Sequence, residues 1–216
     1  MSTVDAPQEQ RFLMRNIDWS KYRSIADDLG ETHVRLTYDR GNLEFMTLSH
    51  GRERWSSLLG QFIEVLTDEL SMPRQSGGST TLNREDVERG IEPDKCYYLE
   101  HEPEVRDKDQ IDLTVDPPPD LAIEVEISRS SLSRMDIYAK LRVPEVWRYD
   151  GEVLRVYQLS EDGRYIQVER SPHFPFLPLD EVQTFLVRRN SMDETSLIKA
   201  FRQWVRELLA RRGDAS

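Results

Sequence analysis

The residues best suited to chemistry are carboxylates set in an apolar stretch, residues 121–127. The stretch reads Leu-Ala-Ile-Glu-Val-Glu-Ile, which has the β-branched, apolar character of a buried central strand. Glu124 and Glu126 interrupt it, and burying an unpaired carboxylate costs several kcal/mol. Side chains on a strand alternate between faces, so Asp120, Glu124 and Glu126 should project from one side while the apolar residues fill the other. We therefore expect these acids to have a compensating cation.

Two further acids are expected near this strand. Asp94 stands at the start of another predicted strand, and Glu53 opens a predicted helix. Carboxylates from two strands of one sheet and from a helix end can hold Mg²⁺ or Mn²⁺ against a phosphate oxygen. Each acid also has a structural interpretation: Glu53 as a first-turn acid favoured by the helix dipole, Asp94 as a strand-end residue, and Glu124 as a salt-bridge partner in the core.

The charge of the chain is unevenly distributed. The formal net charge is −11, which argues at first against nucleic acid, because phosphate binding draws on lysine and arginine. Fifteen acidic and five basic residues lie within residues 83–126, whereas residues 188–212 hold seven basic and three acidic residues. The pattern fits either a solvated acidic loop and a solvated helix, or a divalent-cation site beside a basic surface.

The elements that must position these residues are those of an α/β protein. Residues 1–30 are expected to form an irregular N-terminal arm and residues 31–212 a single domain. Alternation and helical spacing predict a hairpin over 34–45, a helix over 51–70, strands over 74–82, 94–100 and 121–127, a helix over 132–141, a meander over 143–168 with two-residue turns at Asp150-Gly151 and Asp162-Gly163, a loop over 171–178, and a C-terminal helix with a capping box from Ser191 to Glu194.

Several classes of protein are disfavoured by the sequence. The single cysteine, Cys96, forms no internal disulfide, and the four histidines lack zinc-type spacing. The chain shows no membrane-spanning apolar stretch and no secretory signal, which favours a cytoplasmic location. Glycine-rich phosphate loops, nucleophile elbows and HExxH patterns are also absent from the sequence.

Several motifs follow one another along the chain. They are Leu48-Ser-His-Gly-Arg-Glu53, Gly78-Ser-Thr-Thr81, Arg89-Gly-Ile-Glu-Pro-Asp94-Lys-Cys-Tyr-Tyr98, Pro119-Asp-Leu-Ala-Ile-Glu-Val-Glu126, Ile137-Tyr-Ala and Val143-Pro-Glu-Val-Trp147. Taken as a set, these motifs resemble the Uma-type family of restriction-endonuclease-like proteins. The resemblance runs from about residue 36 to residue 209 and implies the fold of the PD-(D/E)-x-K nuclease superfamily, a mixed central sheet flanked by helices.

The resemblance assigns roles to four acids. Asp94 corresponds to the first metal-binding aspartate of the superfamily and Glu124 to its second acid. Glu53 corresponds to the acid that the first helix often donates. Asp120 belongs to a Pro-Asp pair at the strand entrance, as a further metal ligand or an orienting residue.

The basic residue departs from the superfamily pattern. A lysine is expected two positions after Glu124, and this chain has Glu126. In relatives the basic residue often lies on the next helix, four positions before a tyrosine, which selects Arg134 before Tyr138. Lys140 is a second candidate, more than one helical turn further on. An arginine stays charged and can steady a phosphate oxygen, but it is a poor proton acceptor.

Two functional hypotheses follow. The first is a metal-dependent endonuclease acting on DNA, in which Asp94 and Glu124 bind Mg²⁺ or Mn²⁺, Glu53 and Glu126 assist directly or through water, and Arg134 contacts phosphate. The second is a catalytically inactive binding or assembly module that keeps the nuclease fold. The C-terminal helix carries a wide apolar stripe, which either packs on its own domain or builds a homodimer.

Overall fold

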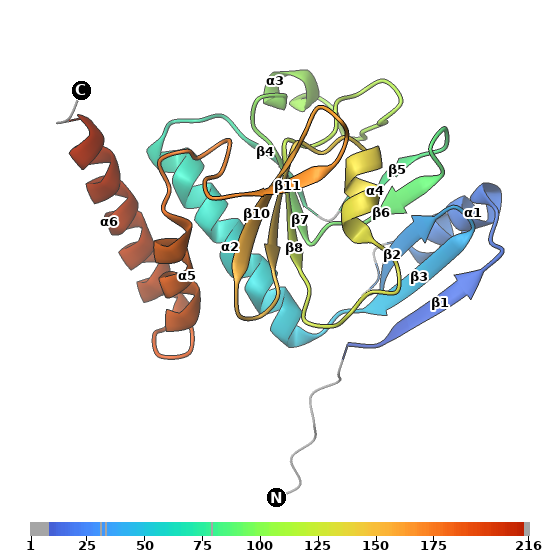
Figure 1. Ribbon diagram of the computed structural model, residues 1–216, viewed down its shortest axis with the longest axis horizontal. Coiled ribbons are helices and arrows are strands. Elements are labelled where there is room, and N and C mark those ends of the chain that lie inside the picture. Colours follow the sequence, from blue (N-terminus) through green and yellow to red (C-terminus); the bar gives the residue numbers. More distant parts are fainter. Residues whose placement is uncertain (1–8, 31, 33, 79, 214–216) are drawn as a thin grey trace, which may run out of the picture.

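The protein has an α/β architecture in which two β-sheets lie side by side with helices packed against them (Figure 1). The computed structural model describes residues 9–30, 32, 34–78 and 80–213. This architecture confirms the predicted restriction-endonuclease-like fold class. The elements are β1 (Arg11–Arg15), α1 (Trp19–Leu29), β2 (Val34–Asp39), β3 (Asn42–Thr47), α2 (His50–Glu69), β4 (Gln75–Gly78), β5 (Leu82–Arg84), β6 (Arg89–Ile91), β7 (Lys95–Tyr98), α3 (Glu102–Val105), β8 (Leu121–Val125), α4 (Arg134–Lys140), β9 (Glu145–Tyr149), β10 (Leu154–Leu159), β11 (Tyr165–Val168), α5 (Leu179–Arg188) and α6 (Glu194–Gly213).

The larger sheet has six strands in the order β11-β10-β9-β8-β7-β4. Strand β8 pairs antiparallel with β7 and parallel with β9, and α4 lies in the connection between the two parallel strands. All five residues of β8 are buried, as expected for a strand covered on both faces. The acid-bearing stretch predicted from the sequence is therefore the centre of the sheet.

The two faces of this sheet pack against different elements. Helix α2 covers one face, and α5 and α6 pack outside it (Figure 1). Alternate residues of β8, namely Leu121, Ile123 and Val125, point into that core. On the other face Ala122 packs with Ile137 of α4. Asp120 and Glu124 share the parity of Ala122, so the predicted alternation of acids and apolar residues along β8 holds.

The smaller sheet has the order β1-β3-β2-β6-β5 and is covered by α1. Its central hairpin turns at Arg40 and Gly41, whose φ angles are 43° and 80°. Two successive positive φ angles match the right-handed twist of the flanking strands, which is why a tight Asp-Arg-Gly-Asn turn works here. This hairpin places β2 alongside β6, and β6 leads directly to the Glu92-Pro-Asp94 segment.

The prediction of an irregular N-terminal arm is wrong for most of the described part of that segment. Residues 11–15 form β1, paired antiparallel with β3, and residues 19–29 form α1. The N-cap of α1 is Asp18, whose side chain accepts a hydrogen bond from the backbone N of Lys21 at 2.8 Å. Its apolar residues Trp19, Tyr22, Ile25 and Leu29 recur at helical spacing and pack with residues of β2, so the sequence carried a helical signal here that was not used.

Three local predictions near the C-terminal half also fail. The turn at Asp150-Gly151 is longer than two residues, because the Asp150 carboxylate caps the backbone N of Val153 at 2.7 Å. Ile127 lies beyond the end of β8 and is 44% exposed rather than packed in the core. Helix α6 is capped by Asp193, which accepts from Ser196 N at 2.9 Å, and not by Ser191. Helix α5 was not predicted at all.

The C-terminal helix packs on its own chain. Leu197, Phe201 and Val205 are buried against α2 and α5, and Arg202 pairs with Glu69 of α2 at 2.7 Å. Figure 1 shows α6 on the far side of α2 from the smaller sheet. No helix among the described residues is both long enough and apolar enough to cross a membrane.

Candidate active site

The two acids with the strongest sequence signal meet through one guanidinium. Arg52, in the first turn of α2, donates from Nε to Asp94 Oδ1 at 2.8 Å and from Nη2 to Asp94 Oδ2 at 2.9 Å. The same Nη2 lies 3.4 Å from Glu124 Oε2. Asp94 immediately precedes β7, and its Oδ2 also accepts from the backbone N of Val125 at 2.7 Å. Asp94 and Glu124 therefore face the same side of the sheet and share one cation.

Glu124 is held from the other side by α4. Arg134 donates from Nε to Glu124 Oε2 at 3.0 Å and from Nη2 to Glu124 Oε1 at 2.6 Å, a bidentate pair. The Tyr138 hydroxyl donates to the same Oε1. Arg134 Nη1 donates to Thr37 Oγ1 at 2.6 Å, which ties α4 to β2 of the smaller sheet. The four residues Arg52, Asp94, Glu124 and Arg134 are called the arginine cluster below.

The position of Arg52 follows from helical spacing. Ser49 caps α2 by accepting from Arg52 N at 3.3 Å, which fixes where the helix begins. Counting by turns along the buried face of α2 then leads through Ser56, Leu59 and Ile63, all of them buried, as Arg52 itself is. Glu53 is one position off this face and its side chain is 46% exposed. Glu53 was predicted from this helix and Arg52 was not: helical spacing places Arg52 on the buried face, but its partners depend on how α2 packs against the sheet.

The N-terminal segment closes over the arginine cluster. Glu9 Oε2 accepts from Arg52 Nη1 at 3.2 Å. Arg11 of β1 binds Glu9 at 2.8 Å and Glu44 of β3 at 2.7 Å. Glu44 is 1% exposed and also accepts from the backbone N of Ser131 at 2.8 Å, just before α4. Opposite charges thus alternate from the cluster to the segment that leads into α4, and no sequence signal pointed to Glu9 or Arg11.

Burial and charge set the protonation states of the cluster. Burial opposes the charged form of Arg134, but the adjacent Glu124 carboxylate outweighs it and raises the pKa of Arg134. The same balance, dominated by Asp94 and Glu124 against desolvation, raises the pKa of Arg52. Burial and the Glu124 charge raise the pKa of Tyr138 well above its usual value. Both guanidinium groups are therefore permanent cations, and the tyrosine is a neutral hydrogen-bond donor.

The other residues selected from the sequence lie outside the cluster. The Glu53 carboxylate lies 4.0 Å from Arg35 Nη2 and is not part of the arginine cluster. Glu126 pairs with Arg148, whose Nε lies 2.6 Å from Glu126 Oε2. Asp120 is four residues before Glu124 on the same strand, roughly 13 Å away at the rise of a β-strand. Lys140 is exposed on α4.

Asp120 belongs to a second buried group of charges. Its Oδ2 accepts from the backbone N of Leu99 at 2.6 Å, and its Oδ1 lies 2.5 Å from His101 Nδ1. Glu145, at the start of β9, lies 2.5 Å from His173 Nδ1 and accepts from Trp147 Nε1 at 2.5 Å. His101, Asp120, Glu145 and His173 are called the histidine cluster below.

A metal could be considered at either group of charges. Ligand atoms of Glu100, Asp120 and His173 lie within 4.8 Å of one another, a suitable spread for a cation. Both oxygens of Asp120 already accept hydrogen bonds from the loop that follows β7, however, so the geometry is accounted for without an ion.

The arginine cluster does not fit a divalent cation in this arrangement. Both oxygens of Asp94 and both oxygens of Glu124 accept hydrogen bonds from within the protein. The guanidinium of Arg52 fills the space between the two carboxylates, where a shared metal would bind. Two arginines already balance the charge of the two acids, so a divalent cation would add an excess positive charge to a buried site.

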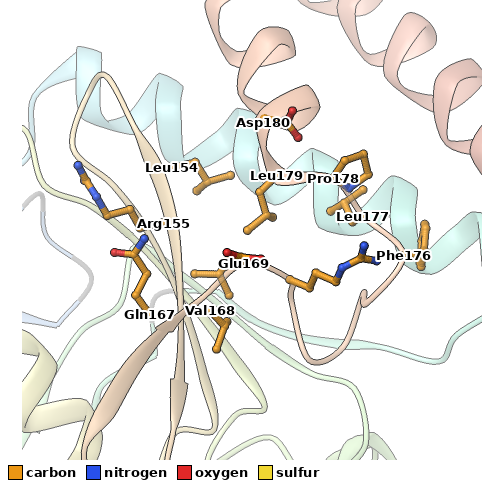
Figure 2. A pocket seen from close by; sticks show the side chains of 12 residues that line it. Leu154, Arg155, Gln167, Val168, Glu169, Phe176, Leu177, Pro178, Leu179 and Asp180 are labelled. Carbon is orange, nitrogen blue, oxygen red and sulfur yellow. The ribbon is translucent and has the colours of Figure 1, made fainter.

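Several cavities open on the described structure, and three of them bear on the candidate site. One of about 110 Å³ is lined by Glu124 and Arg134 of the arginine cluster, among others. Figure 2 shows one of about 420 Å³ at the outer edge of the larger sheet, between β10, β11 and the start of α5. It includes no residue of the arginine cluster. Another, of about 740 Å³, is lined by Arg35, Glu53 and Glu92 among others and lies next to the cluster.

The mixed sheet, the acids on adjacent strands and the basic residue on the following helix place the protein in the restriction-endonuclease-like class. Residues 19–188 match the family model of Uma2, described as a putative restriction endonuclease, and the chain belongs to this family. The match covers every element from α1 to α5, the arginine cluster included, and it confirms the resemblance found in the sequence. No protein with curated annotation matches the chain.

Proposed function

We propose that the protein is an endonuclease that hydrolyses phosphodiester bonds of DNA at the arginine cluster. The observation that carries this proposal is the convergence of Asp94 and Glu124, from adjacent strands, on one guanidinium. Arg134, to which the resemblance assigns the role of the superfamily lysine, lies 2.6 Å from the Glu124 carboxylate, which supports the proposal. Membership of a restriction endonuclease family supports DNA as the substrate.

The side chains of the cluster define what the site can do in this arrangement. Arg52 and Arg134 are permanent cations and can stabilise negative charge on a phosphate oxygen. Glu124 and Asp94 orient both guanidinium groups through paired hydrogen bonds. The expected Mg²⁺ or Mn²⁺ would bind Asp94 and Glu124, but these carboxylates are already bonded to Arg52, so no step is assigned to a metal.

A second candidate function is favoured by the same observation. In a nuclease-fold binding module, the arginine cluster would be structural and would fix α2 and α4 to the sheet. Arg52 supports this alternative because it neutralises the acids and fills the space between them. The two candidates differ in what loss of a cluster acid does: a catalytic cluster loses cleavage, and a structural cluster loses only stability.

The test is cleavage of supercoiled plasmid DNA by purified protein with Mn²⁺, with Mg²⁺ and with EDTA. We expect slow nicking or linearisation by the wild type and no cleavage by Asp94→Ala, and the rates with Mn²⁺, with Mg²⁺ and with EDTA measure how far cleavage depends on a metal. Circular dichroism establishes that Asp94→Ala is folded at the assay temperature. Equal activity in the wild type and Asp94→Ala would indicate a contaminant and favour the binding module.

A further inference from the structure

Arg35 of β2 is a buried cation without a hydrogen-bond partner among the described residues. The residue is 8% exposed, and its Nε is buried and makes no hydrogen bond. Its one ion pair is a contact of 4.0 Å between Nη2 and Glu53 Oε1, which is too long for a hydrogen bond. Buried guanidinium groups are normally paired and hydrogen-bonded, as Arg52 and Arg134 are. Arg35 is the exception in this part of the fold.

The side chain of Arg35 forms part of the wall of the cavity of about 740 Å³. Thr81, Gly77 and Glu92 line the same cavity from the segments around β4 and β6. The cavity is open to solvent and Arg35 lines it, so a ligand that enters meets the Nη groups of Arg35, whereas its buried Nε is enclosed. Solvent access and the long contact with Glu53 explain how a cation without a hydrogen bond is tolerated at this position.

The cavity adjoins the arginine cluster through β2. Arg35 and Thr37 are two residues apart on one face of the strand, roughly 7 Å at the rise of a β-strand. Thr37 Oγ1 accepts from Arg134 Nη1 at 2.6 Å. The backbone carbonyl of Glu92, a residue that lines the cavity, accepts from Arg134 Nη2 at 2.8 Å. A ligand on Arg35 would therefore lie next to the cluster.

We infer that this cavity binds a phosphate group of a nucleic acid strand, with Arg35 as the residue that holds it. A guanidinium presents parallel N–H donors that match two oxygens of one phosphate, and Arg35 has these donors unused. The inference rests on the proposed function for the identity of the ligand, because a nuclease must hold the strand on either side of the bond it cuts. Arg35 is a positioning residue for substrate, outside the chemistry assigned to the arginine cluster.

Acidic residues in the cavity wall modulate this binding. Asp27, Glu53 and Glu92 all line the cavity and repel an anion, so a single free phosphate should bind weakly. Burial raises the pKa of Glu92, against the opposing charge of Arg35, which makes its neutral form easier to reach. A strand that also contacts the protein elsewhere would bind more tightly than free phosphate, because its phosphate enters the cavity at high effective concentration.

The test is binding of a fluorescently labelled single-stranded thymidine oligonucleotide, followed by anisotropy in EDTA so that no cleavage occurs. We expect Arg35→Met to weaken binding about tenfold and to lower the slope of log Kd against log salt by about 0.7, the value for one phosphate contact on a single strand. The matched control is Arg40→Met, which removes the same charge from a side chain that is 67% exposed. The control should bind as the wild type does.

A second readout needs no oligonucleotide. Inorganic phosphate should raise the melting temperature of the wild type relative to chloride at the same ionic strength, and Arg35→Met should lose this effect. The variant should stay folded, because the buried Nε of Arg35 makes no hydrogen bond to break, although Glu92 loses a compensating charge.

The inference is overturned if Arg35→Met binds the oligonucleotide as the wild type does, if both arginine variants weaken binding equally, or if the wild type binds neither probe. Arg35-dependent binding without cleavage in any metal would retain this site and reject the proposed endonuclease. Cleavage together with oligonucleotide binding that does not depend on Arg35 would reject this site and retain the proposed endonuclease.

Discussion

The charges of the two buried acids at the ends of β8 are compensated in different ways. Glu124 at one end and Asp120 at the other are 2% and 1% exposed and lie on the same face of the strand. Glu124 is compensated by Arg134 and Arg52, which stay charged at every pH at which the protein folds. Asp120 is compensated by backbone N–H groups and by His101, and its neighbour Glu145 by His173.

This difference separates a fixed electrostatic unit from a titratable one. A guanidinium forms parallel hydrogen bonds with a carboxylate and keeps its geometry, which suits a site that must orient charge. An imidazole gains or loses its charge near neutral pH, so the histidine cluster can change its stability with pH. The arginine cluster is therefore the stronger candidate for an active site. The histidine cluster is the stronger candidate for a purely structural contact that joins β8, β9 and the 171–178 loop.

The largest expected effect is the loss of Arg134. Arg134→Ala leaves the buried Glu124 carboxylate with Arg52 as its remaining arginine partner. Breaking a buried ion pair of this kind lowers the free energy of unfolding by about 3–5 kcal/mol. Arg148→Ala is the matched control. Arg148 pairs with Glu126, which comes just after β8, but this pair is partly exposed. Its loss should cost about 1 kcal/mol or less. Urea unfolding measures both, and equal costs would contradict the view that the arginine cluster is a buried unit.

The next effect concerns metal binding after removal of Arg52. Arg52→Ala opens the space between Asp94 and Glu124 and leaves the cluster with a net negative charge. We expect Mn²⁺ to stabilise this variant by about 2.7 kcal/mol when its concentration is a hundredfold above Kd. In the wild type we expect no stabilisation from Mn²⁺ binding between Asp94 and Glu124. Melting curves with and without Mn²⁺ provide the measurement, with Arg148→Ala as the control. Stabilisation of the wild type that is lost in Asp94→Asn would show that Arg52 does not block the metal.

The smallest expected effect is a pH dependence of the histidine cluster. Burial lowers the pKa of His173, but the hydrogen bond and charge of Glu145 outweigh it, and the net pKa is raised. Protonation therefore stabilises the fold: the contribution is complete below the ordinary pKa of histidine, about 6.5, and is lost as pH rises through the raised value. The stability gap between the wild type and His173→Gln should narrow as pH rises over this window. A gap that widens with pH would contradict the assignment.

The sequence predicted β8, α2 and the β2–β3 hairpin well because their signals are strong and local. The apolar run of β8, the helical stripe of α2 and the Asp-Arg-Gly-Asn turn each determine their own conformation. β1 is short, and its pairing with β3, far away in the chain, decides its conformation. α1 and α5 do carry apolar residues at helical spacing, such as Trp19 and Tyr22 in α1 and Val182 and Phe185 in α5, and these signals were overlooked.

The same distinction applies to the candidate site. Asp94 and Glu124 could be selected because an acid in an apolar strand is conspicuous, and Arg134 because the family places a basic residue on that helix. Arg52 and Glu9 could not be assigned, because their roles depend on how α2 and the N-terminal segment pack against the sheet. Asp120 looked like a member of the same site, but strand geometry separates it from Glu124.

The most direct test of the proposed function compares one buried glutamate from each cluster. Glu124→Gln and Glu145→Gln each remove one buried carboxylate charge and keep the side-chain shape. Initial rates of plasmid cleavage are measured for both variants and the wild type, at a temperature at which circular dichroism shows all three folded. The proposal predicts cleavage by the wild type and Glu145→Gln, and a loss of at least about a hundredfold in Glu124→Gln, as for removal of a group that acts on transition-state charge. Equal rates in the two variants, or no cleavage by the wild type, would contradict it.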